Sequence, residues 1–454
     1  MSPIETIKTW KKKSNGVSKH LSNTAWLLFE RVFSMGISFF VGAWVARYLG
    51  PEGQGILSYG QSFIMFFVIF ADLGLNKMLV RELVEKSEKD PGKLLGTSLG
   101  LRLGSGVLAY LVMFVMIQFW SQGSPANEVI LILGLMILVK SIGVIFESHL
   151  NARVLGRLDA QVKFVSGLVT SGLRILAILS GMSIYWFAVI LVLTELVNAI
   201  GMGWFAFKRI PSPTPWKFDM GYARQLVKDS WSLLLAGFVI TVYMQIDQVM
   251  ITNMIGAYQN GIYAVAMRLL SVWYFIPGIV SKAILPAIMN AYKTDEKLFT
   301  HRVQMLMDIF WVIAVGIGLL MAVFGKTIVY GLFGDEFGPA TQVIYIHIWS
   351  LLFVFIGTAG SNWLLCKNLQ HISLYRTILG MVVNIGLNYF LIPTMGINGA
   401  AIATLVSQMM ASYVGYLLSP KTHEVFFLQT KSLFGISLIQ NLRSGAFLSL
   451  IKRS

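Results

Sequence analysis

The chain has 454 residues, of which 56% are hydrophobic and only 13% are charged, whereas a typical soluble domain carries about 25% charged residues. Its mean hydropathy is +0.69, which excludes a soluble protein because too few polar side chains are present to cover a core of this size. The net charge of +15 is typical of a nucleic-acid-binding protein, but in a membrane protein the same excess collects in cytoplasmic loops, so we expect no nucleic-acid partner.

The N-terminal segment, residues 1–21, is polar and basic and is predicted to stay in the cytoplasm. The apolar stretch that follows is longer than the apolar region of a signal peptide and lacks a small-residue cleavage site. We therefore interpret it as the first transmembrane helix.

Twelve stretches are long and apolar enough to cross a bilayer as helices, which takes about 20 residues. Their length and their lack of period-2 alternation exclude a β-barrel. The predicted spans are residues 22–46, 56–80, 95–120, 128–150, 160–180, 184–207, 230–254, 261–289, 303–325, 340–364, 373–393 and 397–418.

The orientation follows from the distribution of Lys and Arg between the loops. Of the 36 cations, 28 fall on the side that carries both termini, and only Arg47 and Lys326 fall on the other side. Because cytoplasmic loops retain Lys and Arg, this alternation predicts that both termini are cytoplasmic. It also leaves very short external loops, with no room for a large external catalytic domain.

The middle loop divides the chain into two halves of six helices. It contains Pro211, Pro213 and Pro215, a density that favours a stiff, extended connector. The predicted segments are a basic N-terminus (1–21), an N-terminal lobe (22–207), a cytoplasmic Pro-rich linker (208–229), a C-terminal lobe (230–419) and a tail (420–454).

The two halves begin with related hairpins, which indicates an internal repeat. Gly50 and Gly256 are 206 residues apart, and Gly55 and Gly261 are separated by the same interval. These glycines are candidates for tight turns and close helix contacts, since glycine accepts positive φ and lets another backbone approach. A hairpin between membrane helices favours glycine even without duplication, so that alternative stays open.

The tail mixes apolar residues with Lys431, Arg443, Gln429 and Gln440. It is too polar for a clear span, and we expect an amphipathic helix in the membrane interface.

Four motifs make this sequence resemble the polysaccharide transporter, or O-antigen flippase, family, which belongs to the multidrug/oligosaccharidyl-lipid/polysaccharide exporter superfamily. The motifs are ARYLGPEGQG at 46–55, DLGL at 72–75, QIDQVMI at 245–251 and GINGAA at 396–401, and the resemblance covers about residues 20–420.

The resemblance implies an all-α membrane protein in which about twelve transmembrane helices form two six-helix lobes around a central cavity. It implies a flippase, not an enzyme, that moves a polyprenyl-diphosphate-linked oligosaccharide across the cytoplasmic membrane of a bacterium or archaeon by alternating access. The implied partners are this lipid-linked oligosaccharide, membrane lipids, and the polymerase and chain-length regulator of surface polysaccharide synthesis.

Six cations remain inside predicted spans, and they are Arg31, Arg102, Lys140, Arg174, Arg268 and Lys282. A charge at the bilayer centre costs roughly 3 kcal/mol on insertion scales, so their presence indicates a polar interior or ion pairs. Arg binds phosphate oxygens through a planar fork and Lys acts as a point charge. We therefore select Arg31, Arg268, Lys140 and Arg174 as candidates for diphosphate binding, with buried ion pairs that fix helix packing as the alternative. Arg102 and Lys282 lie near cytoplasmic ends, where we expect them to snorkel.

Acidic residues in the spans are candidates for ion coupling, since burial raises a carboxylate pKa and a nearby Arg lowers it. Asp247, Glu195 and Glu30 are selected, with static salt bridges as the alternative. Pro277 and Pro286 fall in the span 261–289, where a kink could serve as a hinge or as a packing feature.

No cofactor, metal or catalytic residue is expected. The only cysteine is Cys366, and the six histidines show no metal-ligand spacing, so neither a disulfide nor a cysteine-based metal site is indicated. Two other functions stay open: a cation-coupled drug antiporter of the same superfamily, and a membrane polysaccharide polymerase or glycosyltransferase. The intramembrane cations disfavour the first, and the short external loops disfavour the second.

Overall fold

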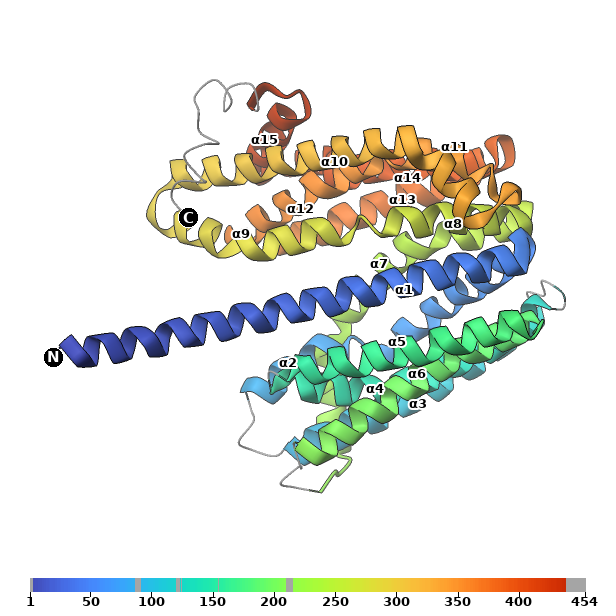
Figure 1. Ribbon diagram of the computed structural model, residues 1–454, viewed down its shortest axis with the longest axis horizontal. Coiled ribbons are helices and arrows are strands. Elements are labelled where there is room, and N and C mark those ends of the chain that lie inside the picture. Colours follow the sequence, from blue (N-terminus) through green and yellow to red (C-terminus); the bar gives the residue numbers. More distant parts are fainter. Residues whose placement is uncertain are drawn as a thin grey trace. The chain divides into compact units, whose positions relative to one another are not determined.

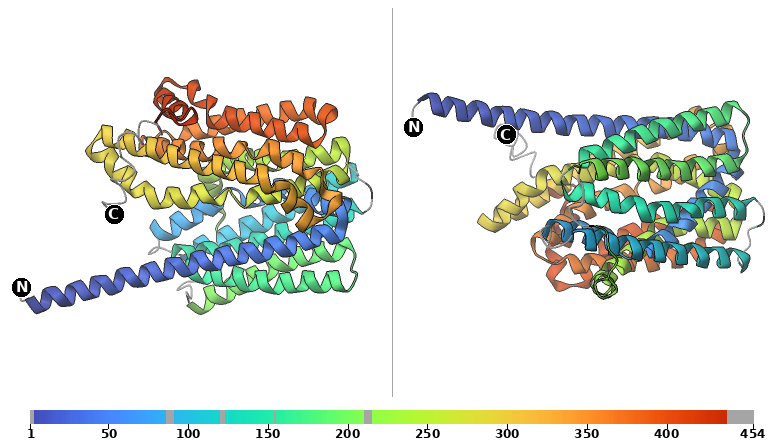
Figure 2. Two further views of the ribbon diagram at one scale, coloured as in Figure 1. Left: turned by 45° about the horizontal axis from the view of Figure 1, so that its top comes forward. Right: turned by 90° about the horizontal axis from the view of Figure 1, so that it is seen from below.

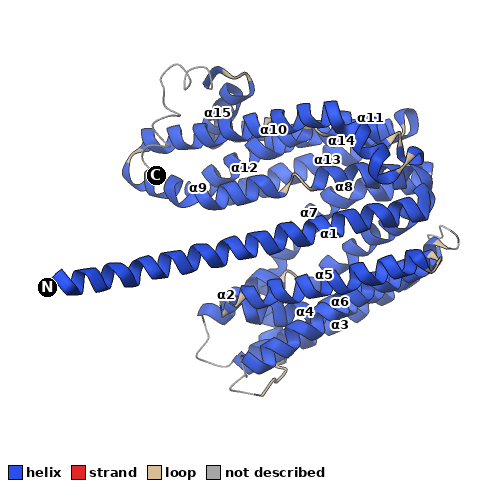
Figure 3. Ribbon diagram, in the orientation of Figure 1, coloured by secondary structure: helices blue, strands red, loops and turns tan. Residues whose placement is uncertain are grey.

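The computed structural model describes residues 3–85, 91–119, 123, 125–153, 155–209 and 215–437, with side chains described from Phe33 onward except those of Lys77 and Glu85. Helices make up nearly all of these residues, and the described part contains no strand (Figure 3). The predicted all-α membrane protein is thus confirmed. Eleven described segments are long and apolar enough to cross a membrane, and one of them, Phe33–Asp72, contains two helices joined at Gly50.

The helices follow one another with short connections (Figure 1). In chain order they are α1 Pro3–Asp72, α2 Leu75–Glu85, α3 Pro91–Phe119, α4 Ala126–Ala152, α5 Gly156–Leu179, α6 Ile184–Arg209, α7 Met220–Ile255, α8 Ala257–Ser271, α9 Phe275–Thr294, α10 Glu296–Phe333, η1 Asp335–Phe337, α11 Ala340–His347, α12 Ser350–Cys366, α13 Gln370–Met395, α14 Ile397–Ser412, η2 Val414–Leu418, η3 Pro420–Thr422 and α15 His423–Leu433.

The chain forms two compact units. The first consists of Met1–Tyr48 and Phe67–Leu234, and the second of Leu49–Phe66 and Leu235–Ser454. The middle of the long α7 is therefore divided between them. The predicted segment boundaries at 22–207, 208–229 and 230–419 stay a prediction, although α7 begins at Met220, before the predicted start of its span.

In the first unit, α3, α4, α5 and α6 lie side by side as a bundle (Figures 1 and 2). Small residues allow close contact between α4 and α6: a Cβ added at Gly143 would lie 3.2 Å from the Cβ of Ala199. Small residues at such contacts are typical of helix packing in lipid, where van der Waals contact replaces the hydrophobic effect.

One face of α3 is apolar and exposed, as expected of a surface that meets lipid tails. Leu108, Leu111 and Val115 are 62%, 53% and 52% exposed. They recur at the three- and four-residue spacing of a single helix face, so the solvent of this face is the bilayer.

In the second unit, α10 lies alongside α9, joined to it by a short turn (Figures 1 and 2). The side chain of Asp295 accepts hydrogen bonds from the amides of Lys297 and Leu298 and so begins α10, because these first amides have no partner within the helix. The α13–α14 hairpin turns at Gly396, whose φ is +60°.

The span predicted over residues 261–289 is found within one apolar segment, Ala257–Thr294, but this segment is not a single continuous helix. The chain makes two helices, α8 and α9, separated at Val272–Tyr274 by hydrogen bonds of the three-residue type. The reason is local, because Pro277 has no amide hydrogen and cannot make the helical hydrogen bond to the carbonyl oxygen of Trp273. Pro277 lies in the first turn of α9, where proline is tolerated, and Pro286 lies within α9.

The prediction that Arg102 snorkels to the interface was wrong. Arg102 is only 2% exposed and forms an ion pair with Asp72 in the first unit. Because an isolated buried guanidinium is costly, the nearby carboxylate determines where this side chain lies. Lys282 is exposed.

The described part of the tail contains the short η3 and the helix α15, which packs against α10 and α12. Its inner face is buried through Val425, Leu428 and Ser432, whereas Phe427 is 60% exposed. This two-faced burial agrees with the predicted amphipathic helix. Residues 438–454 of the predicted tail, including Arg443, lie outside the described residues.

Candidate functional site

The second unit contains a buried carboxylate surrounded by neutral hydrogen-bond donors. Asp247 of α7 is 7% exposed. Its Oδ1 accepts from Asn388 Nδ2 of α13 at 2.6 Å, and its Oδ2 accepts from Tyr263 Oη of α8 at 2.8 Å and from Thr404 Oγ1 of α14 at 2.6 Å. The network therefore ties four helices together through one side chain.

A second layer of amides extends the network within α13. Asn384 Oδ1 accepts from Asn388 Nδ2 at 3.2 Å, and both asparagines are fully buried. The Oδ1 of Asn388 is buried and has no hydrogen-bond partner among the described residues. An acceptor left without a donor in an interior is costly, so this oxygen is suited to a bound proton carrier or cation.

The chemistry of the cluster follows from its atoms. The side-chain oxygens of Asp247, Asn388 and Thr404 lie within one hydrogen-bonded group, and hard oxygens of this kind suit hard cations. No described residue within ion-pair distance supplies Asp247 with a positive charge. A buried carboxylate that lacks a protein cation is a candidate site for a cation that comes from solution. Groups of three or more His, Cys, Asp or Glu suited to a metal ion do not occur among the described residues.

Sequence reasoning selected Asp247 but missed Tyr263, Asn388 and Thr404. A signal was present: Asn384 and Asn388 are four residues apart in an apolar helix, so they share a face. Polar side chains in membrane helices usually face a protein interior, and this spacing would have predicted their burial.

The first unit brings two predicted residues together. Lys140 Nζ of α4 lies 3.1 Å from Glu195 Oε1 of α6, and both side chains are 25% exposed. This is the ion pair that the sequence left open as an alternative, although a pair so exposed can still exchange partners.

Arg174 of α5 differs from Lys140. It is half-buried, and within the described part of the chain no carboxylate lies within ion-pair distance of its guanidinium. A charge in a membrane helix that has no protein counter-ion needs an anion or water from elsewhere.

The other predicted residues are placed as follows. Arg268 lies half-buried in the last turn of α8, one turn before the break at Val272–Tyr274. Glu30 and Arg31 fall on α1, but their side chains lie outside the described residues.

The repeat glycines form a reciprocal contact within the second unit. A Cβ added at Gly55 would lie 1.8 Å from the carbonyl oxygen of Ala257, and one added at Gly261 would lie 1.8 Å from that of Pro51. Pro51 and Ala257 are themselves 206 positions apart. Asn260 Nδ2 donates to Gly55 O at 3.0 Å across the contact.

The turns before these helices have matching backbones. Gly50 has φ +67° and ψ 177°, and Gly256 has φ +94° and ψ 165°. Residues with a side chain rarely adopt this conformation. The two hairpins of the repeat therefore turn with similar backbone angles at Gly50 and Gly256 and contact each other at Gly55 and Gly261.

Comparison with known proteins decides the family. The family model described as "Polysaccharide biosynthesis protein" matches residues 20–292, more than half of the chain. The chain belongs to this family. A second family model, MatE, matches residues 233–390. The resemblance seen in the sequence motifs is thereby confirmed.

Among its relatives, this family member is 23% identical to an uncharacterized membrane protein of Methanocaldococcus jannaschii over 85% of this chain and 81% of that protein. It is also 23% identical to the probable low-salt glycan biosynthesis flippase of Haloferax volcanii, over 84% of this chain and 79% of that protein.

Solved structures share its fold. The lipid II flippase MurJ in an inward closed conformation has a TM-score of 0.72 at 15% identity, covering 92% of each chain. A multidrug resistance MATE family transporter in an inward-facing conformation has a TM-score of 0.70 at 17% identity, covering 88% of this chain and 96% of that one. The fold is therefore that of MATE- and MurJ-like transporters, as predicted.

Proposed function

We propose that this protein is a flippase that translocates a polyprenyl-diphosphate-linked oligosaccharide repeat unit by alternating access. It acts in the cytoplasmic membrane of a bacterium or archaeon, with both termini in the cytoplasm, and serves the synthesis of O-antigen, capsule or exopolysaccharide. The family, the transporter fold and a relative named as a glycan biosynthesis flippase support this proposal. A polysaccharide polymerase and a chain-length regulator are the protein partners that would use its product.

The observation that carries the proposal is Arg174. A diphosphate headgroup carries about two negative charges, and its desolvation in a bilayer is prohibitive without compensation. An arginine within a membrane helix, half-buried and with no carboxylate beside it in the described part, supplies such compensation. Its planar fork can donate two hydrogen bonds to phosphate oxygens.

Lys140 and Glu195 link the substrate to an ion. In the absence of substrate, Glu195 neutralises Lys140 at 3.1 Å. When a diphosphate takes over Lys140, the Glu195 carboxylate loses its counter-ion and becomes available to a coupling cation. Arg31 and Arg268 are proposed to complete the diphosphate site, and Glu30 is proposed as a further coupling carboxylate.

Asp247 is the second proposed coupling residue. Its carboxylate accepts three hydrogen bonds from neutral groups, and the nearby Asn388 oxygen lacks a donor among the described residues. Uptake and release of a proton or a sodium ion here would change the hydrogen bonding among α7, α8, α13 and α14, and so bias the conformation of the second unit.

The test is to delete the gene in its host and to extract polyprenyl-linked intermediates. We expect a complete diphosphate-linked repeat unit to accumulate on the cytoplasmic leaflet while surface polysaccharide disappears. The mass of the intermediate then identifies the sugars. Unchanged surface polysaccharide and no accumulated intermediate would refute the proposal.

Complementation with variants tests the site. Arg174→Ala should abolish or strongly reduce surface polysaccharide, and Arg174→Lys should restore part of it, because lysine keeps the charge and loses the fork. Arg157→Ala is the matched control, since Arg157 is exposed and the charge change is the same. The double variant Arg31→Ala/Arg268→Ala should also lose transport while still inserting in the membrane. Normal transport by either Ala variant would remove those residues from the site.

A cation-coupled drug antiporter is the second candidate, favoured by the MatE match over residues 233–390. It predicts that deletion raises sensitivity to cationic drugs and leaves polysaccharide intact. The free positive charge at Arg174 disfavours a cationic substrate in the first unit.

A further inference from the structure

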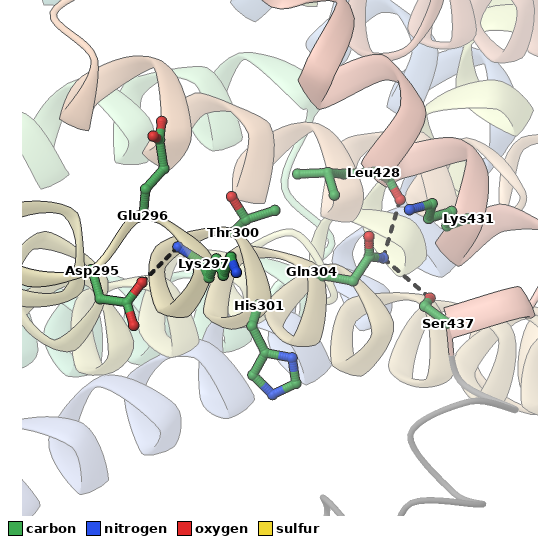
Figure 4. Close-up of a pocket in the computed structure, with 9 residues that line it drawn as sticks. All are labelled: Asp295, Glu296, Lys297, Thr300, His301, Gln304, Leu428, Lys431 and Ser437. Carbon is green, nitrogen blue, oxygen red and sulfur yellow. Dashed lines mark hydrogen bonds between the residues drawn. The ribbon is translucent and has the colours of Figure 1, made fainter.

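A pocket in the second unit lies beside α15, away from the Asp247 network. It has a volume of about 630 Å³ and is lined from α10 and its N-terminal turn, from α15 and from the residues that follow α15 (Figure 4). The lining residues are Asp295, Glu296, Lys297, Thr300, His301, Gln304, Leu428, Lys431 and Ser437.

The two carboxylates of this pocket are already engaged. Asp295 Oδ1 accepts from the amides of Lys297 and Leu298 at 2.8 and 3.3 Å, and Glu296 Oε1 lies 2.8 Å from Lys367 Nζ. The hydroxyl of Thr300 is also used, since it donates to Glu424 Oε1 at 3.1 Å.

The basic groups of the pocket are not engaged in this way. Lys297 and His301 project from α10 and Lys431 projects from α15, on either side of Gln304 (Figure 4). All three are exposed, and no carboxylate lies within ion-pair distance of any of them in the part of the chain that the structure describes. The pocket therefore places two lysine side chains and one imidazole, none of them held in an ion pair by a described carboxylate, where an anionic group can reach them.

The floor of the pocket has an unused acceptor. Gln304 is 8% exposed, and its Nε2 lies within hydrogen-bond distance of four oxygens: those of Leu428, Ser432 and Ser437 at 3.1, 2.6 and 3.1 Å, and Asp308 Oδ1 at 3.3 Å. The two serine hydroxyls donate to Asp308, so they accept from Gln304 and fix the orientation of its amide. The Oε1 of Gln304 is buried and has no donor among the described residues, which suits a hydroxyl or ammonium group of a ligand.

The helix that carries Lys431 also presents aromatic side chains to the outside. Phe427 and Lys431 are four residues apart in α15 and share one helix face, and Phe434 directly follows the helix. Phe427 and Phe434 are 60% and 73% exposed, and Ile436 just beyond is 46% exposed. An aromatic and basic face on a short helix is typical of an element that lies in the membrane interface. The charge distribution predicts that this is the cytoplasmic side.

We propose that this pocket binds the headgroup of an anionic phospholipid of the cytoplasmic leaflet. The phosphate contacts Lys297, His301 and Lys431, a hydroxyl or ammonium of the headgroup donates to Gln304 Oε1, and the acyl chains lie against Phe427 and Phe434. Basic pockets between membrane helices on the cytoplasmic side bind such headgroups. The pocket shares no residue with the proposed translocation site, and the proposal does not depend on which substrate is moved.

The experiment uses the purified full chain in detergent and native mass spectrometry, with phosphatidylglycerol and phosphatidylcholine as probes. We expect the wild type to retain one tightly held phosphatidylglycerol and to prefer it over phosphatidylcholine. The double variant Lys297→Gln/Lys431→Gln should bind phosphatidylglycerol roughly 30-fold more weakly, as expected from removing two lysine charges near an anionic headgroup.

Lys208→Gln/Lys228→Gln is the matched control. Both lysines are exposed and lie in the first unit on the predicted cytoplasmic side, and replacing them removes the same charge. It should bind like the wild type. Phe427→Ser/Phe434→Ser should weaken binding of phosphatidylglycerol but not of glycerol phosphate, which has the headgroup without acyl chains.

Three results would overturn the proposal. They are equal phosphatidylglycerol binding by the wild type and the Lys297→Gln/Lys431→Gln variant, an equal loss in the control variant, and binding of inorganic phosphate or glycerol phosphate as tight as that of the lipid. The last result would identify the pocket as a site for a free phosphate ester. Size-exclusion profiles of the variants establish that each is folded.

Discussion

The crossing of the two repeat hairpins gives the sharpest prediction about stability. In Gly55→Ala, the new Cβ would be placed 1.8 Å from the carbonyl oxygen of Ala257, well inside van der Waals contact. Both groups belong to helical backbone, so no side chain can rotate away, and the helices must separate. Overpacking of this kind costs about 1–3 kcal/mol.

Separation would also lengthen the hydrogen bond from Asn260 Nδ2 to Gly55 O, now 3.0 Å, and its loss adds about 1 kcal/mol. We therefore expect Gly55→Ala to lower the free energy of unfolding by about 2–4 kcal/mol. For a unit of this size, this corresponds to a decrease in Tm of roughly 5–15 °C. Gly261→Ala should behave alike, because its Cβ would meet Pro51 O at the same 1.8 Å.

The assay is thermal unfolding of detergent-purified protein, followed by intrinsic fluorescence. Gly316→Ala in α10 is the control, since an added Cβ there has no heavy atom within 4 Å, and alanine favours a helix by up to about 1 kcal/mol. The double variant Gly55→Ala/Gly261→Ala should cost less than the sum of the single variants, because one separation relieves both clashes. Equal Tm values for Gly55→Ala and Gly316→Ala would refute the reasoning.

Three further predictions concern charged groups. Asp247→Asn should abolish the dependence of transport on the coupling ion in proteoliposomes while the protein still folds, and transport that keeps its ion dependence would remove Asp247 from the mechanism. Lys140→Gln, Glu195→Gln and their double variant should give a coupling energy of about 1 kcal/mol in a thermal-unfolding cycle, because each side chain is 25% exposed; additive effects would show that the pair does not interact. Arg102→Ala should destabilise the protein by about 3–5 kcal/mol, since it leaves Asp72 of the buried pair uncompensated, whereas Arg157→Ala should have little effect on Tm; equal effects would contradict the assigned burial.

The break between α8 and α9 shows which features of a helix can be predicted from nearby residues in the sequence. Pro277 lies three residues beyond Tyr274 and removes a ladder bond, so a break near it is a local effect that hydropathy alone passes over. Hydropathy averages over about a full span, and the segment from α8 to α9 stays apolar throughout. The span predicted over 261–289 is therefore found as one apolar segment that is divided into two helices.

Some site residues could be recognised from the sequence, and others only from their contacts in the structure. Asp247 stood out because a carboxylate in an apolar helix is costly, which needs no structure to recognise. Its partners Tyr263, Asn388 and Thr404 lie 16, 141 and 157 residues away, and nothing local pairs them with it. Arg102 illustrates the converse: its position near a helix end predicted snorkelling, but its burial depends on Asp72, 30 residues away.

The membrane class and the approximate number of spans follow from the sequence alone, because insertion into lipid depends on the composition of each segment taken separately. The family follows from the motifs, and the glycines of the repeat stand out because positive φ and close backbone contact are requirements on single residues. The pairing of charges, the neutral donors around Asp247 and the meeting of Lys297 and Lys431 at one pocket required the folded structure. These features depend on contacts between helices distant in the chain, and side-chain electrostatics is determined by such contacts rather than by sequence neighbours.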